Sequence, residues 1–404
     1  MEGRILVHQK ENRFFPVILS VGMLLTLLLS ACKPTDIEEA QSGLTITSSN
    51  SETGTLQFQQ TFSNGFSVDA SYTQPKDVNT NAVSVYSVEY ASFLENTKKF
   101  TDLFFSDQDL PQSEKLVDEN SNALPNGDQP TTLHWTMDDG TTLYLSNTGT
   151  ISFETPLSES ISWSYSDPDS DGGAGSNADA FTKEELDSYS KQEATDAVEN
   201  IVQTLGLPFG EPVNVVTLDR ETLQALQVDP KEEAAKPEEA PEKKETWTDD
   251  DECYAFYFQQ EVDGIPVSAS VVSNERGSSN GPSLKILYGK NGVVEFQATV
   301  FNQEDSEAET VSLCNVEEPL QTIIDQYSAI DLAGDQLKLS GISLQYGVLT
   351  RQSGQYLFEY TPVYTFAMEN VINANNIHTS DYTEKDTHFT TYVFVDAETG
   401  QILS

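Results

Sequence analysis

The sequence predicts an α+β protein in which repeated units, each a helix packed on a curved antiparallel sheet, form two or three subdomains. Stretches that alternate apolar and polar residues recur along most of the chain, and turn dipeptides such as Asp-Gly and Asn-Gly separate them. Helical patterns precede these groups of strands, in an order that repeats up to three times. The length of 404 residues is sufficient for two or three domains.

The N-terminus has the pattern of a secretory signal. Three basic residues come before its apolar run, namely Arg4, Lys10 and Arg13. The run itself, 14–29, has 16 residues and contains Pro16, whereas a membrane-spanning helix needs about 20 apolar residues. The sequence therefore predicts a segment that directs export and does not span the membrane.

The end of this run resembles the lipobox of bacterial lipoproteins, with the residues Leu29, Ser30, Ala31 and Cys32. The alternative is an ordinary signal in which the cysteine occurs by chance. The lipobox interpretation predicts that residues 1–31 are removed and that Cys32 carries acyl chains such as palmitate. Each buried CH₂ contributes about 0.8 kcal/mol, so two or three chains would hold the protein on the extracytoplasmic face of the cell membrane. The pattern indicates a Gram-positive, Firmicutes-type lipoprotein of an uncharacterised family.

The composition excludes one class of partner. The chain has 65 acidic and 21 basic residues, which gives a formal net charge of −44 at pH 7. Such a field repels phosphate backbones and anionic headgroups, so we expect no nucleic-acid partner and no membrane contact beyond the lipid. The acidic excess either keeps an exported protein soluble or attracts cations or a basic partner.

Two cysteines remain after the anchor, Cys253 and Cys314. Disulfides persist outside the cytoplasm, and a bond between these two would contribute about 4 kcal/mol on the chain-entropy model. The alternative is a pair of buried thiols. A zinc site needs clustered ligands, which two distant cysteines do not provide.

Changes in composition predict the order of segments along the chain. They are a signal peptide at 1–31, a flexible tether at 32–53, an N-terminal α+β domain at 54–160, an Asp/Gly/Ser loop at 161–181, a middle α+β domain at 182–300 and a C-terminal α+β domain at 301–404. Within the middle domain, the Pro-punctuated acidic stretch 230–252 cannot bury much apolar surface, so we expect a disordered insertion there.

In the first half of the chain, alternation predicts strands at 55–62 and 66–73, and a three-stranded meander at 131–154 with a turn at Asp139-Gly140. Three phenylalanines at helical spacing predict a helix over 90–105.

The clearest helical pattern covers 183–205. Thr182 and Glu185 have the spacing of a capping box, and Gly206 and Pro208 end the pattern.

In the second half of the chain, the sequence predicts hairpins before and after a single helix. Turns are predicted at Asp263-Gly264 and Asn291-Gly292. A helix is predicted at 317–330, with Pro319 in its first turn, where proline is tolerated. Three strand patterns follow, at 341–350, 356–368 and 388–403.

Two stretches resemble known families. The sequence YVFVDAETGQIL at 392–403 looks like the closing strand-turn-strand of PepSY-type domains. The sequence QQEVDGIPVSASV at 259–271 looks like the corresponding hairpin of YycH/YycI-like extracytoplasmic regulators. The resemblance covers 250–404 and implies a PepSY/cystatin-like part without enzymatic activity, which acts by contacting partner proteins such as sensor kinases or proteases. YycH and YycI have an uncleaved transmembrane anchor, whereas this chain has a lipobox.

The stretch DPDSDGGAGSNAD begins like a calcium-binding loop. Asp167, Asp169 and Asp171 occupy the first three ligand positions, and a glycine follows in the turn position. The last ligand position holds Ala178 in place of a glutamate, and Asp179 comes one residue late. The two interpretations are weak calcium binding and a solvated Gly/Asp loop. We expect no other cofactor.

No pattern typical of an enzyme is convincing. The stretch GSSNG at 277–281 matches G-x-S-x-G around Ser279, but a polar turn precedes it and Pro282 follows it, whereas a nucleophile elbow needs a strand before and a helix after. The histidines outside the signal are scattered, and no pair of carboxylates stands out. We therefore expect no catalytic residues.

Three functions follow in order of preference. The first is a non-catalytic, membrane-anchored lipoprotein that binds or regulates another cell-envelope protein. The second is a surface lipoprotein that binds calcium or a small ligand. The third is an envelope hydrolase, which would need a pocket with convergent carboxylates or a perturbed histidine.

Overall fold

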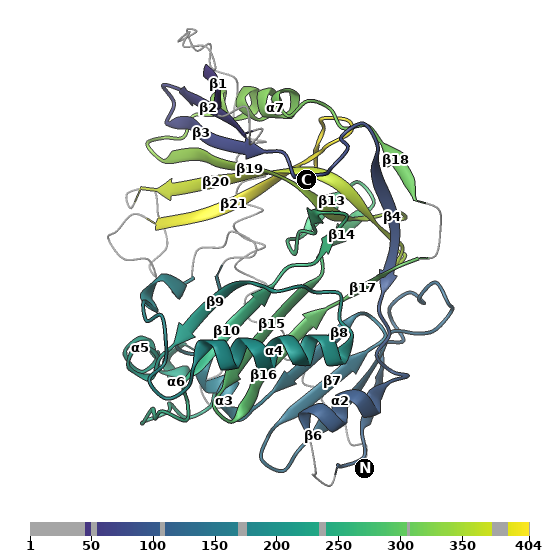
Figure 1. Ribbon diagram of the computed structural model, residues 1–404, viewed down its shortest axis with the longest axis vertical. Coiled ribbons are helices and arrows are strands. Elements are labelled where there is room, and N and C mark those ends of the chain that lie inside the picture. Colours follow the sequence, from purple (N-terminus) through teal and green to yellow (C-terminus); the bar gives the residue numbers. More distant parts are fainter. Residues whose placement is uncertain are drawn as a thin grey trace, which may run out of the picture.

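Two large β-sheets dominate the molecule. The computed structural model describes residues 45–49, 55–105, 110–168, 176–233, 240–304, 308–373 and 387–403. Strands make up 42% of these residues and helices 17%. We name the sheets the upper and the lower sheet after their places in Figure 1. Among the described residues, no helix is both long enough and apolar enough to cross a membrane.

The upper sheet has ten strands and joins the two ends of the chain. Its main order is β1-β2-β3-β19-β20-β21-β22, while β4 pairs with β20, β17 and β18. The strands are β1 Thr45–Ser49, β2 Thr55–Thr61, β3 Phe66–Thr73, β4 Val83–Tyr90, β17 Phe301–Gln303, β18 Glu309–Val311, β19 Gln336–Thr350, β20 Phe358–Ile372, β21 Thr387–Asp396 and β22 Ile402–Leu403. All pairs are antiparallel except β3 with β19.

One helix packs on this sheet. Helix α7, Glu317–Ser328, buries Leu320, Ile323 and Ile324 in a core shared with β2, β3, β19 and β20 (Figure 1). These residues recur at a spacing of three and four, so they lie on one side of the helix.

The lower sheet has eight antiparallel strands in the order β5-β6-β7-β8-β16-β15-β10-β9. They are β5 Glu114–Val117, β6 Thr131–Thr136, β7 Thr142–Ser146, β8 Thr150–Glu154, β16 Gly292–Thr299, β15 Ser283–Gly289, β10 Cys253–Phe258 and β9 Pro212–Leu218. Between β10 and β15, two short ribbons lie against β19, made of β11 Glu261–Val262 with β12 Ile265–Pro266, and β13 Val272–Asn274 with β14 Gly277–Ser279.

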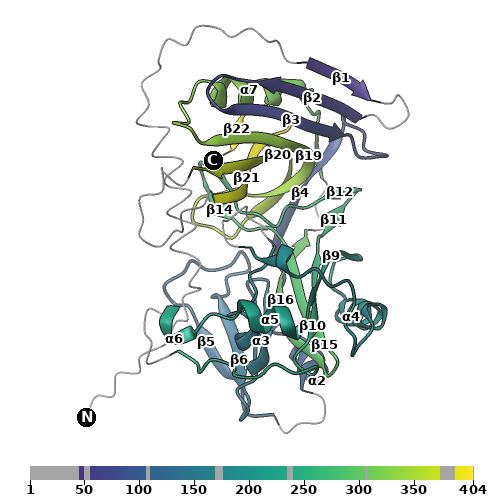
Figure 2. The ribbon, with the colours of Figure 1, turned by 90° about the vertical axis from the view of Figure 1, so that its left-hand side faces the viewer.

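Helices cover the two faces of the lower sheet unequally. On one face, α4 (Lys191–Leu205) crosses the strands and α2 (Thr97–Phe104) packs beside it, over a core of phenylalanines and leucines (Figure 1). The other face carries a smaller core with α3 (Pro156–Ile161) and α5 (Arg220–Leu226). Figure 2 shows α4 and α5 on opposite sides of β10 and β15.

The chain enters and leaves the lower sheet at one place. It passes from β4 to the lower sheet at Ala91 and returns to β17 after Val300, and the Ala91 N–H donates to the Val300 carbonyl at 3.0 Å. Gly149 fastens this junction, because its N–H donates to Ala91 and its carbonyl accepts from Val300, each at 2.9 Å. Gly149 has φ +75°, and a Cβ there would lie 2.6 Å from the Val300 carbonyl oxygen, so only glycine fits.

This architecture corrects the predicted fold class. The prediction of repeated helix-on-sheet units is wrong, because strand residues far outnumber helix residues in the described part of the chain, and the strands assemble into two large sheets with few helices. The sheets also cut across the predicted segments: the stretch 54–160 contributes β2 to β4 to the upper sheet and β5 to β8 to the lower one. Strand pairing over such separations has no local signature.

Several predicted elements are confirmed, namely β3, the meander β6–β8, the Asn291-Gly292 hairpin and α7. Two predicted helix starts are wrong. Helix α2 begins at Thr97, because the preceding main chain is bonded to the junction and to β7. Helix α4 begins at Lys191, because Ser190 provides the N-cap by accepting from the Glu193 N–H.

The acidic stretch 230–252 is ordered in its described part. Residues Pro230–Glu233 form α6, and the segment from 240 onward carries Trp247, which is buried in the smaller core of the lower sheet. Its indole Nε1 donates to the Gln227 side chain at 3.1 Å. The prediction of disorder is wrong for these residues, because burial of Trp247 attaches the segment to the core.

Candidate functional site

A row of polar side chains crosses the lower sheet on the face away from α4. Neighbours in the strand register link them from one edge to the other, and the row comprises Glu114, His134, Tyr144, Ser152, Gln297, Lys285, Tyr257 and Asn214. We call this the polar row. Side chains alternate between faces along a strand, so the apolar neighbours of these residues face α4.

The first part of the polar row contains a histidine stacked on a tyrosine. The rings of His134 and Tyr144 are 4.1 Å apart and inclined by only 8°. His134 Nε2 and the Thr136 hydroxyl are 3.0 Å apart, and the Ser152 hydroxyl donates to Glu154 at 3.0 Å. Burial lowers the pKa of His134, although the charge of Glu114 opposes the shift. This part of the polar row presents two stacked aromatic rings with the carboxylates of Glu114 and Glu154 nearby. Such a surface is suited to non-covalent binding of another molecule.

The second part centres on a lysine held between two carboxylates. Lys285 Nζ lies 2.9 Å from Glu295 Oε1 and 3.0 Å from Asp167 Oδ2. The Tyr257 hydroxyl donates to Asp167 Oδ1 at 2.8 Å, and the Tyr165 hydroxyl lies 2.5 Å from that of Tyr257. We call these five residues the lysine cluster. The side chains of Lys285 and Glu295 are 18% and 7% exposed, so the pair is largely shielded from water.

Burial and charge act in opposite directions in this cluster. Burial raises the pKa of Glu295, and the neighbouring Lys285 opposes that shift. Burial would lower the pKa of Lys285, but the carboxylates of Glu295 and Asp167 outweigh it and raise the pKa. Burial, followed by the charge of Asp167, raises the pKa of Tyr257, so its hydroxyl stays protonated as a donor.

The structure assigns the predicted calcium ligand Asp167 to the lysine cluster. Both of its oxygens are engaged, one by Lys285 and the other by Tyr257. Asp179 lies in the 3₁₀ helix Ala178–Ala180 and is exposed, while Asp169 and Asp171 fall outside the described residues. Within the described ranges, no three His, Cys, Asp or Glu side chains converge as a metal site would require.

The two cysteines are free thiols in different cores. Cys253 is buried in the smaller core of the lower sheet, and Cys314 is half-buried against the core of the upper sheet. The sequence left two interpretations open, a disulfide and two thiols, and in the structure Cys253 and Cys314 are not bonded to each other. The lipobox residues Leu29, Ser30, Ala31 and Cys32 lie outside the described residues.

Ser279 is occupied by a structural hydrogen bond. It lies in β14, a short strand of a ribbon, and its buried hydroxyl donates to the Val348 carbonyl at 2.5 Å. This agrees with the expectation that GSSNG is no nucleophile elbow, because the stretch joins strands and no helix follows it.

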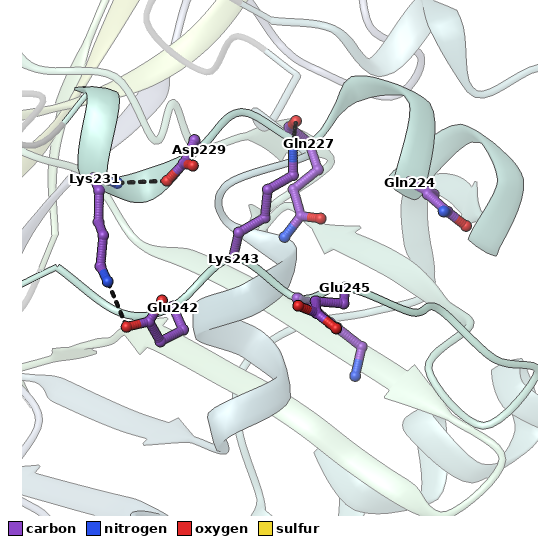
Figure 3. Close-up of a pocket in the computed structure, with 8 residues that line it drawn as sticks. Gln224, Gln227, Asp229, Lys231, Glu242, Lys243 and Glu245 are labelled. Carbon is purple, nitrogen blue, oxygen red and sulfur yellow. Dashed lines mark hydrogen bonds and ion pairs between the residues drawn. The ribbon is translucent and has the colours of Figure 1, made fainter.

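A depression beside α5 and α6 is lined by polar residues that bind one another (Figure 3). Lys231 pairs with Glu242, and its main-chain N–H donates to Asp229 at 2.9 Å. Lys243 Nζ donates to the Gln227 carbonyl at 3.3 Å. These contacts attach the segment that follows residue 240 to the body of the protein, so the depression is best explained as a structural clamp.

Comparison with known proteins shows a shared fold. No family model matches the sequence, and no curated protein matches it. The crystal structure of an uncharacterized protein from Eubacterium rectale is similar, with a TM-score of 0.61 and 15% sequence identity. The similarity covers 86% of this chain and 92% of that one. At this identity the likeness shows the fold alone, so the same two-sheet architecture occurs in another bacterial protein.

Sequence reasoning missed the residues of the lysine cluster other than Asp167. Lys285 and Glu295 alternate with apolar residues, which is also the pattern of a solvated strand face. One signal was available: the two opposite charges flank the Asn291-Gly292 turn, so a hairpin brings them together. The contribution of Asp167 depends on the path of the chain after α3, which has no such signal.

Proposed function

We propose that this protein is a non-catalytic, lipid-anchored extracytoplasmic protein that binds another protein of the cell envelope through the polar row. The observation that carries the proposal is the stretch of the row from β5 to β16, where Glu114 and Gln297 are exposed and the stacked rings of His134 and Tyr144 lie between them. A broad polar surface with an aromatic centre resembles the composition of protein interfaces, where tyrosine is enriched.

The charge of this face favours a basic partner. Glu114 and Glu154 lie on the same side of the sheet as the stacked rings, and the whole chain has a formal net charge of −44. Such a field accelerates the approach of a positively charged protein and repels acidic ones. Salt should therefore weaken the interaction.

The N-terminus supports a location at the membrane. The lipobox residues end at Cys32, and the first described strand begins at Thr45. The structure thus places β1 inside the predicted tether 32–53, and the 12 residues 33–44 would have a reach of about 20 Å if they behave as a flexible chain. Such a tether would let the polar row meet a partner embedded in, or attached to, the same membrane.

A site-specific photo-cross-linker at Gln297 tests the interface in living cells. The matched control carries the same group at Gln203, which is also exposed but lies on α4, on the other side of the lower sheet. We expect one envelope protein to be captured from Gln297 and not from Gln203, with less capture at high salt. Equal capture from both positions, or none from Gln297, would refute binding through the polar row.

A second variant tests the anchor. Cys32→Ala removes the residue that would carry the lipid, so the protein should leave the membrane fraction and the specific capture should be lost. If the Cys32→Ala protein stays in the membrane fraction, the anchor is wrong, whatever the result at Gln297.

A further inference from the structure

We infer that the side chains of Lys285 and Asp167 become joined by an intramolecular amide bond, with Glu295 as the proton carrier. The inference concerns the lysine cluster and does not depend on the proposed binding function. It would give the protein an internal covalent cross-link between the segment after α3 and strand β15.

The geometry brings the three reacting groups into contact. Lys285 Nζ is 3.0 Å from Asp167 Oδ2 and 2.9 Å from Glu295 Oε1, so the amine lies beside both the carboxyl group it would attack and a base. Groups held in such proximity react far faster than the same groups free in solution. The cluster is held in place on three neighbouring strands, because Lys285, Glu295 and Tyr257 come from β15, β16 and β10.

The reaction balances without any further reagent. Glu295 takes a proton from the Lys285 ammonium group, and the neutral amine attacks Cγ of Asp167. A new N–C bond forms and the C–Oδ2 bond breaks. The departing oxygen leaves as water, with the proton held by Glu295 and a second proton from the nitrogen. One positive and one negative charge disappear, no atom is oxidised or reduced, and Glu295 returns to its starting state.

Two features of the site favour this step. The Tyr257 hydroxyl donates to Asp167 Oδ1 at 2.8 Å, where negative charge develops during the attack, and it thus acts as an oxyanion donor. The other feature is the shielding of Lys285, whose side chain is 18% exposed, whereas that of Asp167 is 46% exposed. A charge shielded from water is costly, and amide formation removes the ammonium charge of Lys285. Burial also raises the pKa of Glu295, which makes it a better proton acceptor.

The other charged pairs of the protein provide an internal control. Lys290 contacts Asp250 at 3.2 Å, but both side chains are at least half exposed to water. Lys338 pairs with Glu369 on the upper sheet, and these side chains are 40% and 49% exposed. In both pairs the lysine is more exposed than Lys285, and among the described residues neither lysine contacts a second carboxylate that could carry the proton, so both pairs should stay unlinked.

Peptide mapping of the full chain, purified from membranes in detergent, tests the inference. Trypsin cleaves after lysine and arginine but not after an acylated lysine. The cross-linked protein should therefore yield peptides 116–183 and 277–290 as one branched species, lighter than their sum by one water molecule. Peptides 116–183, 277–285 and 286–290 recovered separately at their unmodified masses would overturn the inference.

Three variants test the assigned roles. Lys285→Arg and Asp167→Ala each remove a reacting group, and Glu295→Gln keeps the shape of the proton carrier but not its function. We expect the branched peptide to be lost completely in all three. It should be retained in Lys290→Arg, where trypsin still cleaves after residue 290 and the branched peptide changes only by the mass difference between lysine and arginine. A branched peptide that persists in Glu295→Gln would show that Glu295 is not the proton carrier. If a variant does not fold, the wild-type digest still decides whether the bond exists.

Discussion

The side-chain amide of Asn64 binds the C-terminal end of helix α7, where its Nδ2 donates to the Ile330 carbonyl at 2.7 Å. The same nitrogen contacts the carbonyls of Tyr327 and Ser328, at 2.9 and 3.2 Å. Asn64 lies in the turn between β2 and β3, and its Oδ1 accepts from the Phe66 N–H at 3.0 Å. One side chain therefore satisfies the free carbonyls of a helix end and fixes the first hairpin of the upper sheet against it.

Replacing Asn64 should destabilise the upper sheet. Asn64→Ala leaves several carbonyls of the α7 end without a donor, and we expect a loss of about 1–3 kcal/mol in the free energy of unfolding. Asn64→Asp should cost more, because it adds a negative charge at the negative end of the helix dipole. Urea unfolding measures both, with Asn302→Ala as the control at an exposed position of β17. Equal stability of the Ala and Asp variants would contradict the capping role.

Trp247 should be the residue that orders the segment after residue 240. Trp247→Ala opens a cavity in the smaller core of the lower sheet and removes the bond to Gln227, so we expect a loss of about 3–5 kcal/mol. Trp247→Phe should lose less, since it keeps part of the packing. Glu245→Ala, at an exposed neighbouring position, serves as the control. Chemical denaturation with unchanged stability in Trp247→Ala would mean that this segment is not anchored.

The two thiols should react in sequence with a maleimide. Burial raises the pKa of both Cys253 and Cys314, which lowers their thiolate fraction, and Cys253 has no exposed surface. In the native protein we expect slow labelling of Cys314 and labelling of Cys253 only after unfolding. Mass spectrometry of the Cys253→Ser and Cys314→Ser variants assigns each site. If neither thiol of the wild type is labelled in denaturant without a reductant, the two cysteines form the disulfide after all.

His134 should make stability depend on pH near neutrality. Burial lowers its pKa in the folded state below the ordinary histidine value of 6.5, so the unfolded state binds the proton more tightly. The contribution of His134 is therefore fully present above pH 6.5 and is lost as the pH falls from there through the lower pKa of the folded state. His134→Gln should flatten the fall in unfolding free energy over this range, and His388→Gln, at an exposed position of β21, should not. A steeper fall in His134→Gln would reverse the assigned sign.

Features that depend on neighbouring residues could be predicted from the sequence. Strand β3 follows from its alternation, and the Asp263-Gly264 turn follows from two residue types that accept positive φ, which are +51° and +77° here. The start of α4 could not be predicted in this way. Thr182 with Glu185 and Ser190 with Glu193 have the same cap pattern, and a distant residue selects the second: the Tyr254 hydroxyl accepts from the Leu186 N–H and donates to the Tyr189 carbonyl, which holds the chain before Ser190 out of the helix.

The architecture and the site depend on contacts between distant segments. Strand β3 pairs with β19 in parallel, for example Val68 with Leu339, and nothing in either strand specifies the other. The lysine cluster brings Asp167 to Lys285 in a similar manner. Lys285 and Glu295 alternate with apolar residues, as the residues of an exposed strand face also do. Their burial could therefore not be predicted without knowing that the segment after α3 packs over them.

The insertion of the lower sheet within the upper one sets an order for folding of a chain that emerges from its N-terminus. A chain that has emerged as far as Thr299 contains every strand of the lower sheet but only four of the ten strands of the upper sheet. The apolar side chains of β2 and β3, such as Phe58 and Phe66, would then still lack the β19 and β20 residues that cover them. Limited proteolysis of stalled nascent chains should therefore find the lower sheet protected first. The N-terminal hairpin, although it is made early, is among the last parts of the protein to reach its final place.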